Sequence, residues 1–178
     1  MIIGVSGYAR SGKDTIAEVL IMNYGFKRLA FADNIRKAVK VLDPILENGK
    51  RVSEMVREVG WENTKAQPEM RRLLQVFGTE VGREMFGENF WVDQVFRQIK
   101  SEDRDSNFII TDVRYPNEAD LIRENGGEIW RVSRSLVRPI NGHSSEYAMD
   151  NYEFDRVITN DSDIKDLESN IFNIMRGN

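Results

Sequence analysis

The stretch GYARSGKDT, residues 7–15, combines residue types that can bind phosphate. Gly7, Gly12 and Lys13 fit the pattern GxxxxGK, in which glycines let the backbone curl until its N–H groups converge on an anion. The lysine reaches the terminal phosphates of a nucleotide, and the N-terminus of a following helix adds partial positive charge. An apolar run, MIIGVS, precedes the motif as this arrangement requires. The stretch therefore predicts a phosphate-binding loop.

Asp14 occupies the place where GTPase-like loops carry the hydroxyl that binds Mg²⁺. Two roles are open for this carboxylate. It can face Mg²⁺ or its bound waters, or it can act as an acid in the first turn of a helix, where the helix dipole favours negative charge. Thr15 can cap the same helix and contact a phosphate.

Phosphoryl transfer needs donor and acceptor in line, with cations on the oxygens where charge develops. The segment ITDVRYPNE places Asp112 and Arg114 at the end of an apolar run, and open α/β sheets bind ligands at the carboxyl ends of their strands. Asp112 can bind a water coordinated to Mg²⁺, and Arg114 can hold an acceptor phosphate with two hydrogen bonds. An internal Asp–Arg ion pair is the alternative.

A second group of arginines lies in RVSRSLVR, ahead of a glycine-containing loop. We expect a lid at about 132–150 that closes over the phosphates, with Arg131 and Arg134 on the transferring group. Arg138 fits a solvated charge better. The single histidine, His143, is expected to be structural or a lid contact, because an ionised phosphate acceptor needs no general base.

Polar residues in two further segments are candidates for substrate binding. These are Arg36, Lys37, Arg71, Arg72, Gln75 and Thr79. Adjacent helical positions point about 100° apart, so only one residue of the Arg71–Arg72 pair is expected to face a substrate. Trp91 can stack on a base, although a tryptophan of the core fits the sequence better.

Apolar runs that alternate with helical patterns predict an α/β protein with a three-layer α/β/α sandwich and a mainly parallel sheet. We expect strands at 1–6, 26–31, 107–113, 128–133 and 155–160, and helices at 13–24, 32–42, 68–86, 90–100, 116–127 and 163–175. Asp33 is the expected N-cap of the second helix, and residues 44–66 are expected to be irregular. One domain, 1–178, then carries a helical or irregular insertion on the substrate side at about 38–105.

The composition of the 178 residues narrows the classes of protein. The chain has no cysteine, which excludes thiol catalysis and cysteine-bound metals. A net charge of −4 argues against binding a nucleic acid polymer. The first apolar run is too short for a signal peptide or a membrane span, so we expect no membrane association and a cytoplasmic location.

Five segments taken in order resemble the deoxynucleoside monophosphate kinases encoded by some large bacteriophages, relatives of the P-loop nucleoside monophosphate kinases. They are RSGKDT, RRLLQVFGTEV followed by FWV, ITDVRYPNEADLIRENGGEIWRVSR, HSSE and VITNDSDIKDLESNI. The resemblance implies a fold of the P-loop kinase type and transfer of the ATP γ-phosphate to a 5′-deoxynucleotide with Mg²⁺, in the host cytoplasm if the chain is phage-encoded. Homodimers occur among similar kinases, and residues 77–91 can supply such a surface.

The resemblance also implies roles for single residues. ATP would be held by Gly12, Lys13, Asp14 and Thr15, with Asn160 and Asp161 bordering the adenine. The deoxynucleotide would be held by Arg36, by Arg71 or Arg72, and by Arg114, with Arg131 and Arg134 over the phosphates. Ser162 and Ala9 depart from the family pattern, which can have glycine and lysine at these places.

Two other functions fit parts of the same sequence. A P-loop kinase for another small phosphorylated acceptor, such as phosphomevalonate or dephospho-coenzyme A, also uses a GK loop and arginines at strand ends. An ATP-binding switch or motor would couple hydrolysis to a partner protein, but the sequence lacks an apolar run that ends in two acids.

Overall fold

The computed structural model describes residues 1–103, 105–139 and 144–177. The chain divides into two compact units. The first unit comprises Met1–Ala30 and Arg97–Asn178, and the second comprises Phe31–Phe96. Within the described ranges, no helix is both long enough and apolar enough to span a membrane.

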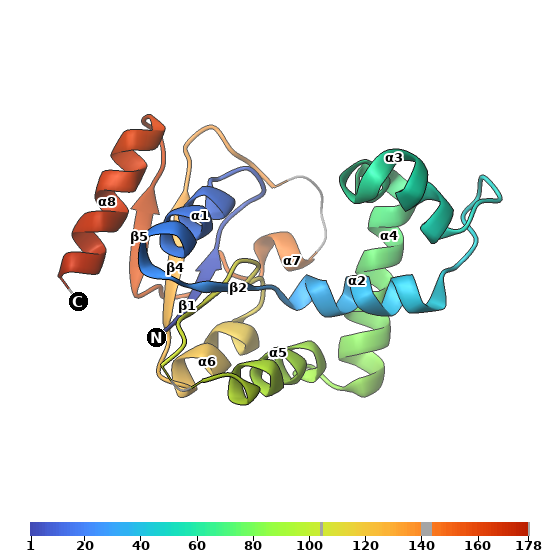
Figure 1. Cartoon of the computed structure of the whole chain (residues 1–178), viewed down its shortest axis with the longest axis horizontal. Coiled ribbons are helices and arrows are strands. Elements are labelled where there is room, and N and C mark those ends of the chain that lie inside the picture. The colour runs from blue at the N-terminus through green and yellow to red at the C-terminus, as the bar shows by residue number, and fades with distance from the viewer. Residues whose placement is uncertain (104, 140–143, 178) are drawn as a thin grey trace. The chain divides into compact units, whose positions relative to one another are not determined.

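The first unit contains a five-stranded sheet in the order β2-β3-β1-β4-β5 (Figure 1). The strands are β1 (Ile2–Ser6), β2 (Lys27–Leu29), β3 (Phe108–Ile110), β4 (Glu128–Ser133) and β5 (Arg156–Thr159). All four pairings are parallel. The carboxyl ends of the strands therefore meet at one edge, where the segments that follow β1, β3, β4 and β5 come together.

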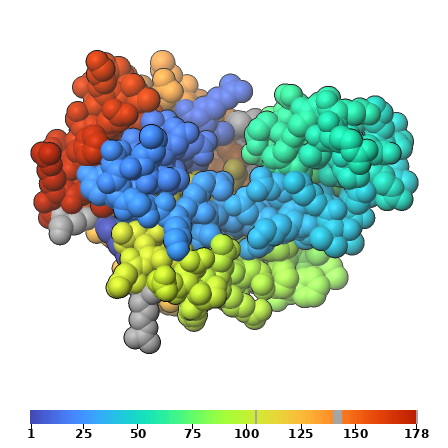
Figure 2. Space-filling view, in the orientation of Figure 1, coloured from blue at the N-terminus to red at the C-terminus, as the bar shows by residue number. Residues whose placement is uncertain are grey.

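Helices cover both faces of this sheet. Helices α1 (Lys13–Tyr24) and α8 (Ile164–Arg176) bury Leu20 and Ile171 in one core with Ile3 and Trp130 of the sheet. At the surface, α8 in red lies beside α1 in blue (Figure 2). On the other face, α6 (Pro116–Glu124) packs against β1 and β4. The predicted three-layer α/β/α sandwich with a parallel sheet is confirmed.

The second unit is helical. It contains α2 (Phe31–Leu42), α3 (Val52–Ala66), α4 (Pro68–Val76), a π-helix (Phe77–Met85) and the first part of α5 (Phe90–Ser101). Its core consists of Val39, Leu46, Val52, Met55 and Met70. This unit thus has a hydrophobic core of its own, built from the apolar faces of its helices.

Two expectations for the start of this unit are wrong. Residues 44–66 include helix α3, which is broken only at Gly60 (φ 80°, ψ 162°). The Asp43 carboxylate accepts hydrogen bonds from the backbone and hydroxyl of Ser53, which stabilises the start of α3. Asp33 is not an N-cap, because α2 begins earlier, at Phe31, a residue that we had assigned to the preceding strand.

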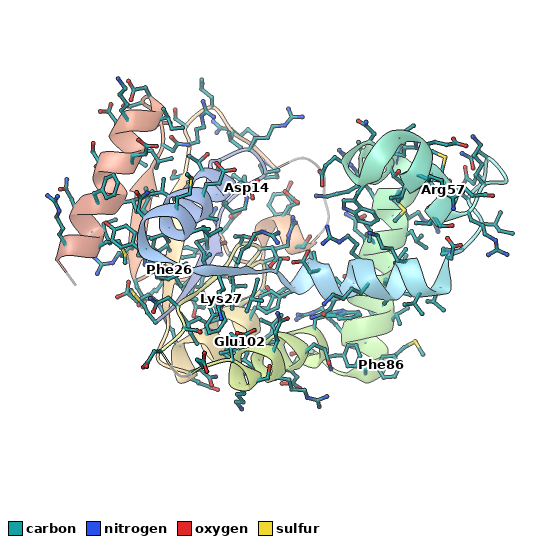
Figure 3. All side chains as sticks on the ribbon, in the orientation of Figure 1. Asp14, Phe26, Lys27, Arg57, Phe86 and Glu102 are labelled. Carbon is teal, nitrogen blue, oxygen red and sulfur yellow. The ribbon has the colours of Figure 1, made fainter. Side chains whose placement is uncertain are left out.

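The helix predicted over 68–86 is correct in extent but not in type beyond Val76. Its second half is a π-helix. Here the Trp91 indole N–H donates to the Gly78 carbonyl at 3.0 Å, and the ring occupies the space that a side chain at position 82 would need. Trp91 is 9% exposed, which favours its interpretation as a core residue over base stacking. The exposed Phe86, labelled in Figure 3, follows the π-helix, and the dimer surface around it stays a prediction.

The contact between Gly82 and Trp91 gives a test of this packing. Gly82→Ala should lower the free energy of unfolding by about 2 kcal/mol, because the new methyl group overlaps the indole and the buried ring must shift. Urea unfolding followed by circular dichroism measures the change. Gly78→Ala is the matched control, since its Cβ would lie 3.2 Å from only the flexible end of Ile35. Equal stability of the two variants would contradict this account.

Candidate functional site

The loop between β1 and α1 has the backbone of an anion cradle. Gly7 (φ 143°) and Gly12 (φ 111°) adopt conformations that side chains rarely allow, and a Cβ on Gly7 would lie 2.5 Å from the Val132 carbonyl oxygen. Ser11 is buried between them, and its hydroxyl has no hydrogen-bond partner among the described residues. A buried hydroxyl of this kind, in a loop that precedes a helix N-terminus, suits a phosphate oxygen.

Lys13 folds back over this loop. Its Nζ donates hydrogen bonds to the carbonyl oxygens of Gly7 (2.8 Å) and Tyr8 (2.7 Å). Burial, and next the charge of Arg114, lower the pKa of Lys13 to about 8. The backbone therefore positions the ammonium group, but its positive charge is only partly balanced. A bound anion would balance that charge.

Arg114 follows β3 and is positioned by two carboxylates. The backbone N–H groups of Arg114 and Tyr115 both donate to the buried Glu118 carboxylate, at 2.7 and 3.1 Å. The Arg114 guanidinium forms an ion pair with Glu146 of helix α7 (Ser144–Tyr147) at 3.1 Å. The arginine side chain is 48% exposed, so another anion can reach it.

Arg131 lies at the carboxyl end of β4 in a polar and aromatic cluster. Its guanidinium forms an ion pair with Asp150 at 3.1 Å and lies over the rings of Tyr8 and Phe154. The Tyr8 hydroxyl donates to the same Asp150 carboxylate at 2.8 Å. Burial, together with Asp150, raises the pKa of Tyr8, which keeps this hydroxyl protonated. The cluster fixes Arg131 beside the phosphate loop.

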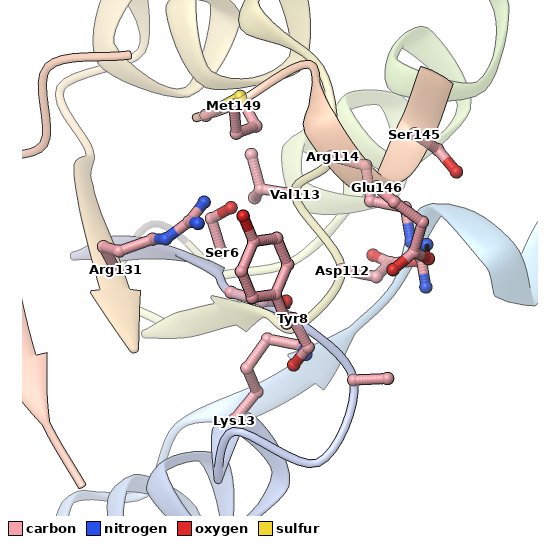
Figure 4. A pocket seen from close by; sticks show the side chains of 12 residues that line it. Ser6, Tyr8, Lys13, Asp112, Val113, Arg114, Arg131, Ser145, Glu146 and Met149 are labelled. Atoms are coloured by element: carbon pink, nitrogen blue, oxygen red, sulfur yellow. Dashed lines mark hydrogen bonds and ion pairs between the residues drawn. The ribbon is translucent and has the colours of Figure 1, made fainter. Parts of the chain in front are cut away.

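Tyr8, Lys13, Arg114, Arg131 and Glu146 line one pocket at the carboxyl edge of the sheet (Figure 4). Lys13 comes from the segment after β1, Asp112 and Arg114 come from the segment after β3, and Arg131 belongs to the carboxyl-terminal half of β4. These three strands are adjacent in the sheet. The carboxylates of Asp14, Glu146 and Asp112 each act on Lys13 to raise its pKa, against the larger effects of burial and Arg114. A group of cations with displaceable carboxylate partners can bind a phosphorylated ligand.

Other predicted residues lie elsewhere in the first unit. Arg134 is exposed and follows β4, and Arg138 donates to carbonyls of its own turn at Ser135 and Val137. Asp161 accepts from the Ser135 N–H, and this contact lowers the pKa of Asp161. His143 lies outside the described residues. Only part of the predicted lid, up to 139 and from 144, is described.

The predicted substrate residues of the helical segments all belong to the second unit, and their role stays a prediction. Arg36 forms an ion pair with Asp33 at 3.1 Å, and its guanidinium lies over the Trp61 ring. The remaining members fall into two groups. Exposed residues are Lys37, Arg71 and Arg72, and partly buried ones are Gln75 and Thr79.

Four residues of the pocket region were missed in the sequence: Tyr8, Glu118, Glu146 and Asp150. Glu118 had a signal, because proline at the first helical position followed by glutamate at the third is typical of a capped helix start. Of the two lid carboxylates, Glu146 lies in the segment HSSE that carries the family resemblance, but no pattern pairs it with Arg114, and Asp150 had no signal. Each meets its arginine only through the fold.

Candidate metal ligands are sparse. No group of three or more Asp, Glu or His side chains with metal-binding geometry occurs in the part of the chain that the structure describes. Asp14, labelled at the start of α1 in Figure 3, is exposed, and Asp112 lines the pocket. Two carboxylates near a phosphate site fit Mg²⁺, which uses one or two carboxylates together with substrate phosphates and water.

A family model described as deoxynucleotide monophosphate kinase matches residues 45–171. The chain belongs to this family. A protein of Acanthamoeba polyphaga mimivirus named putative deoxynucleotide monophosphate kinase is 28% identical over 193 residues, which cover 96% of this chain and 94% of that protein. The deoxynucleotide monophosphate kinase of Escherichia phage RB69 is 33% identical over 110 residues, or 60% of this chain, and this match spans only 45% of the phage protein.

A solved structure shares the fold of this chain. Dephospho-CoA kinase from Campylobacter jejuni superposes with a TM-score of 0.52 at 16% identity, covering 98% of this chain and 95% of the other. At this identity the likeness concerns the fold and leaves the acceptor open.

The pKa of Lys13 gives a test of the loop electrostatics. In metal-free buffer, we expect the Lys13 side chain to titrate at about 8, and tripolyphosphate to raise this midpoint because the anion favours the ammonium form. Tripolyphosphate affinity should correspondingly fall as the pH rises above about 8. NMR of ¹³C-labelled lysine measures the titration, with the resonance assigned by its loss in Lys13→Arg. A midpoint near 10.5, the ordinary pKa of a lysine side chain, would contradict this account of the Lys13 environment.

Proposed function

We propose that this chain transfers the γ-phosphate of ATP to a 5′-deoxynucleoside monophosphate, giving the diphosphate and ADP. The observation that carries the proposal is the single pocket that contains Lys13, Arg114 and Arg131 above the glycine loop. Family membership favours a deoxynucleotide as the acceptor. A pocket with this arrangement of cations suits two phosphorylated ligands whose reacting groups meet between them.

In the proposed reaction, an oxygen of the acceptor phosphate attacks the γ-phosphorus in line. The bond between that phosphorus and the β–γ bridging oxygen breaks, and the electron pair leaves on ADP. Lys13 would bind the β- and γ-phosphates, Arg114 the acceptor phosphate, and Arg131 the transferring group. The acceptor is already ionised, so the step needs no general base.

The geometry of the loop fits the phosphates of ATP. The unpartnered Ser11 hydroxyl and the space at Gly7 and Gly12, which a Cβ would fill, both belong to the cradle. In this structure, Arg114 forms an ion pair with Glu146, and Arg131 forms one with Asp150. Phosphate oxygens would replace these carboxylates as the arginine partners, since both anions accept the same bidentate hydrogen bonds.

Asp14 and Asp112 would hold Mg²⁺, directly or through water. Bound there, the ion would neutralise charge on the β- and γ-phosphates. For Asp14, the first-turn position on α1 also allows the simpler role of an acid that stabilises the helix N-terminus.

Acceptor-dependent release of ADP tests the proposed reaction. The purified chain with ATP and Mg²⁺ is assayed with each deoxynucleoside monophosphate, the matching ribonucleotides, phosphomevalonate, dephospho-coenzyme A and no acceptor. We expect turnover with at least one deoxynucleotide, and a fall of at least about 100-fold in Lys13→Ala, because the charge on the terminal phosphates is lost. Turnover only with a non-nucleotide acceptor would support the related kinases, and hydrolysis independent of any acceptor would support a switch.

Arg114 should affect the acceptor more than ATP. In Arg114→Ala we expect the acceptor KM to rise or kcat to fall by about 100-fold, with the ATP dissociation constant changed by less than about threefold, because the lost guanidinium would hold the acceptor phosphate. Steady-state kinetics and calorimetry give the two quantities. Arg138→Ala is the matched control, because that guanidinium bonds carbonyls of its own turn. An unchanged dependence on the acceptor would refute the role of Arg114.

A further inference from the structure

Asn160 connects the end of β5 to the phosphate loop. Its side-chain N–H donates to the backbone carbonyl oxygen of Ser11 at 2.7 Å, across 149 positions of sequence. Its own backbone N–H donates to the Ser133 carbonyl at the end of β4, at 2.8 Å. The sheet therefore holds the backbone of Asn160, and its side-chain amide is directed at the loop.

The contact bears on the orientation of one peptide group. The chain contains no cis peptide bond among the described residues, and in a trans peptide the C=O and the next N–H point in opposite directions. When Asn160 holds the Ser11 carbonyl on one side, the Gly12 N–H must point to the other. Rotation of this peptide would break the hydrogen bond to Asn160.

Gly12 is what allows Asn160 to approach. A Cβ on Gly12 would overlap the Asn160 amide, and Leu167 of α8 lies behind it at 3.8 Å. Gly12 also has φ 111° and is the residue directly before α1, where its carbonyl accepts the first helical hydrogen bond from Ile16. One glycine thus meets two requirements, a backbone conformation and close contact with the asparagine.

We propose that Asn160 is a positioning residue of the phosphate loop, which holds the Ser11–Gly12 peptide so that the Gly12 N–H is directed at a bound phosphate. The inference rests on the phosphate site of the proposed function. This role differs from the one that the family resemblance implies for Asn160, which is to border the adenine. The side-chain amide of Asn160 is instead hydrogen-bonded to the backbone of the phosphate loop. In this arrangement, Asn160 acts on every ligand with a triphosphate, whatever its base.

The test compares ligands that share phosphates but differ in base. Calorimetry gives the affinities of ATP, GTP and inorganic tripolyphosphate for the full chain and for Asn160→Ala and Asn160→Asp. We expect all three ligands to lose affinity by the same factor, about tenfold for Asn160→Ala, because the peptide is no longer held by a hydrogen bond. Asn160→Asp should lose more, since a carboxylate oxygen would then face the Ser11 carbonyl oxygen.

A control and a second measurement separate positioning from folding. Asp163→Ala removes the hydrogen bond from the Asp166 N–H that caps α8, so it loosens the same segment without touching the loop. We expect its affinities for all three ligands to match those of the unmodified chain. The Gly12 amide resonance in ¹⁵N NMR should shift when tripolyphosphate is added to the unmodified chain, and shift less in both Asn160 variants.

The outcomes are distinct. Unchanged tripolyphosphate affinity in the Asn160 variants, or a changed ratio of ATP to GTP affinity, would overturn the inference. Asn160 would then contact the nucleobase of the ligand. Equal losses in Asp163→Ala would overturn it in favour of a general effect on folding. If the unmodified chain bound neither ATP nor tripolyphosphate, the proposed function itself would fail, and the inference with it.

Discussion

The partly buried ammonium group of Lys13 is the constraint on which the rest of the site depends. A charge removed from water needs hydrogen-bond acceptors, and the carbonyl oxygens of Gly7 and Tyr8 supply them. They can do so only because the loop turns back on itself, which requires the left-handed backbone of Gly7 and Gly12. The lowered pKa shows that this compensation is incomplete, so the same loop favours an anion.

Carboxylates balance the remaining cations of the pocket. A chain with a net charge of −4 concentrates Lys13, Arg114 and Arg131 in one place, where they repel one another. Glu146 and Asp150 offset this repulsion from a single segment of the predicted lid, residues 144–150. In the proposed function, phosphate oxygens would take the place of these two carboxylates as the partners of the arginines.

Local patterns predicted most of the fold because their causes are local. The apolar runs of the strands and the helical spacing of apolar residues each act within a few residues. Helix α3 was missed because the proline, the asparagine and the glycines at 44, 48, 49 and 60 indicate irregular structure. Val52, Met55 and Val56 nevertheless have helical spacing and pack into the core. The π-helix had no such signal, and its closest packing partner, Trp91 against Gly82, comes from the next helix.

For the site, the sequence by itself determined the phosphate loop and the arginines at the strand ends. The loop residues are contiguous, and their glycines specify the backbone directly. Only the tertiary structure decided which groups hold these residues in place: Glu146 on Arg114, Asp150 on Arg131 and Asn160 on Ser11, at separations of 32, 19 and 149 positions. The physical reason is the strand order β3-β1-β4-β5, which brings the segments after these strands to one edge of the sheet, where opposite charges and buried polar groups must find partners.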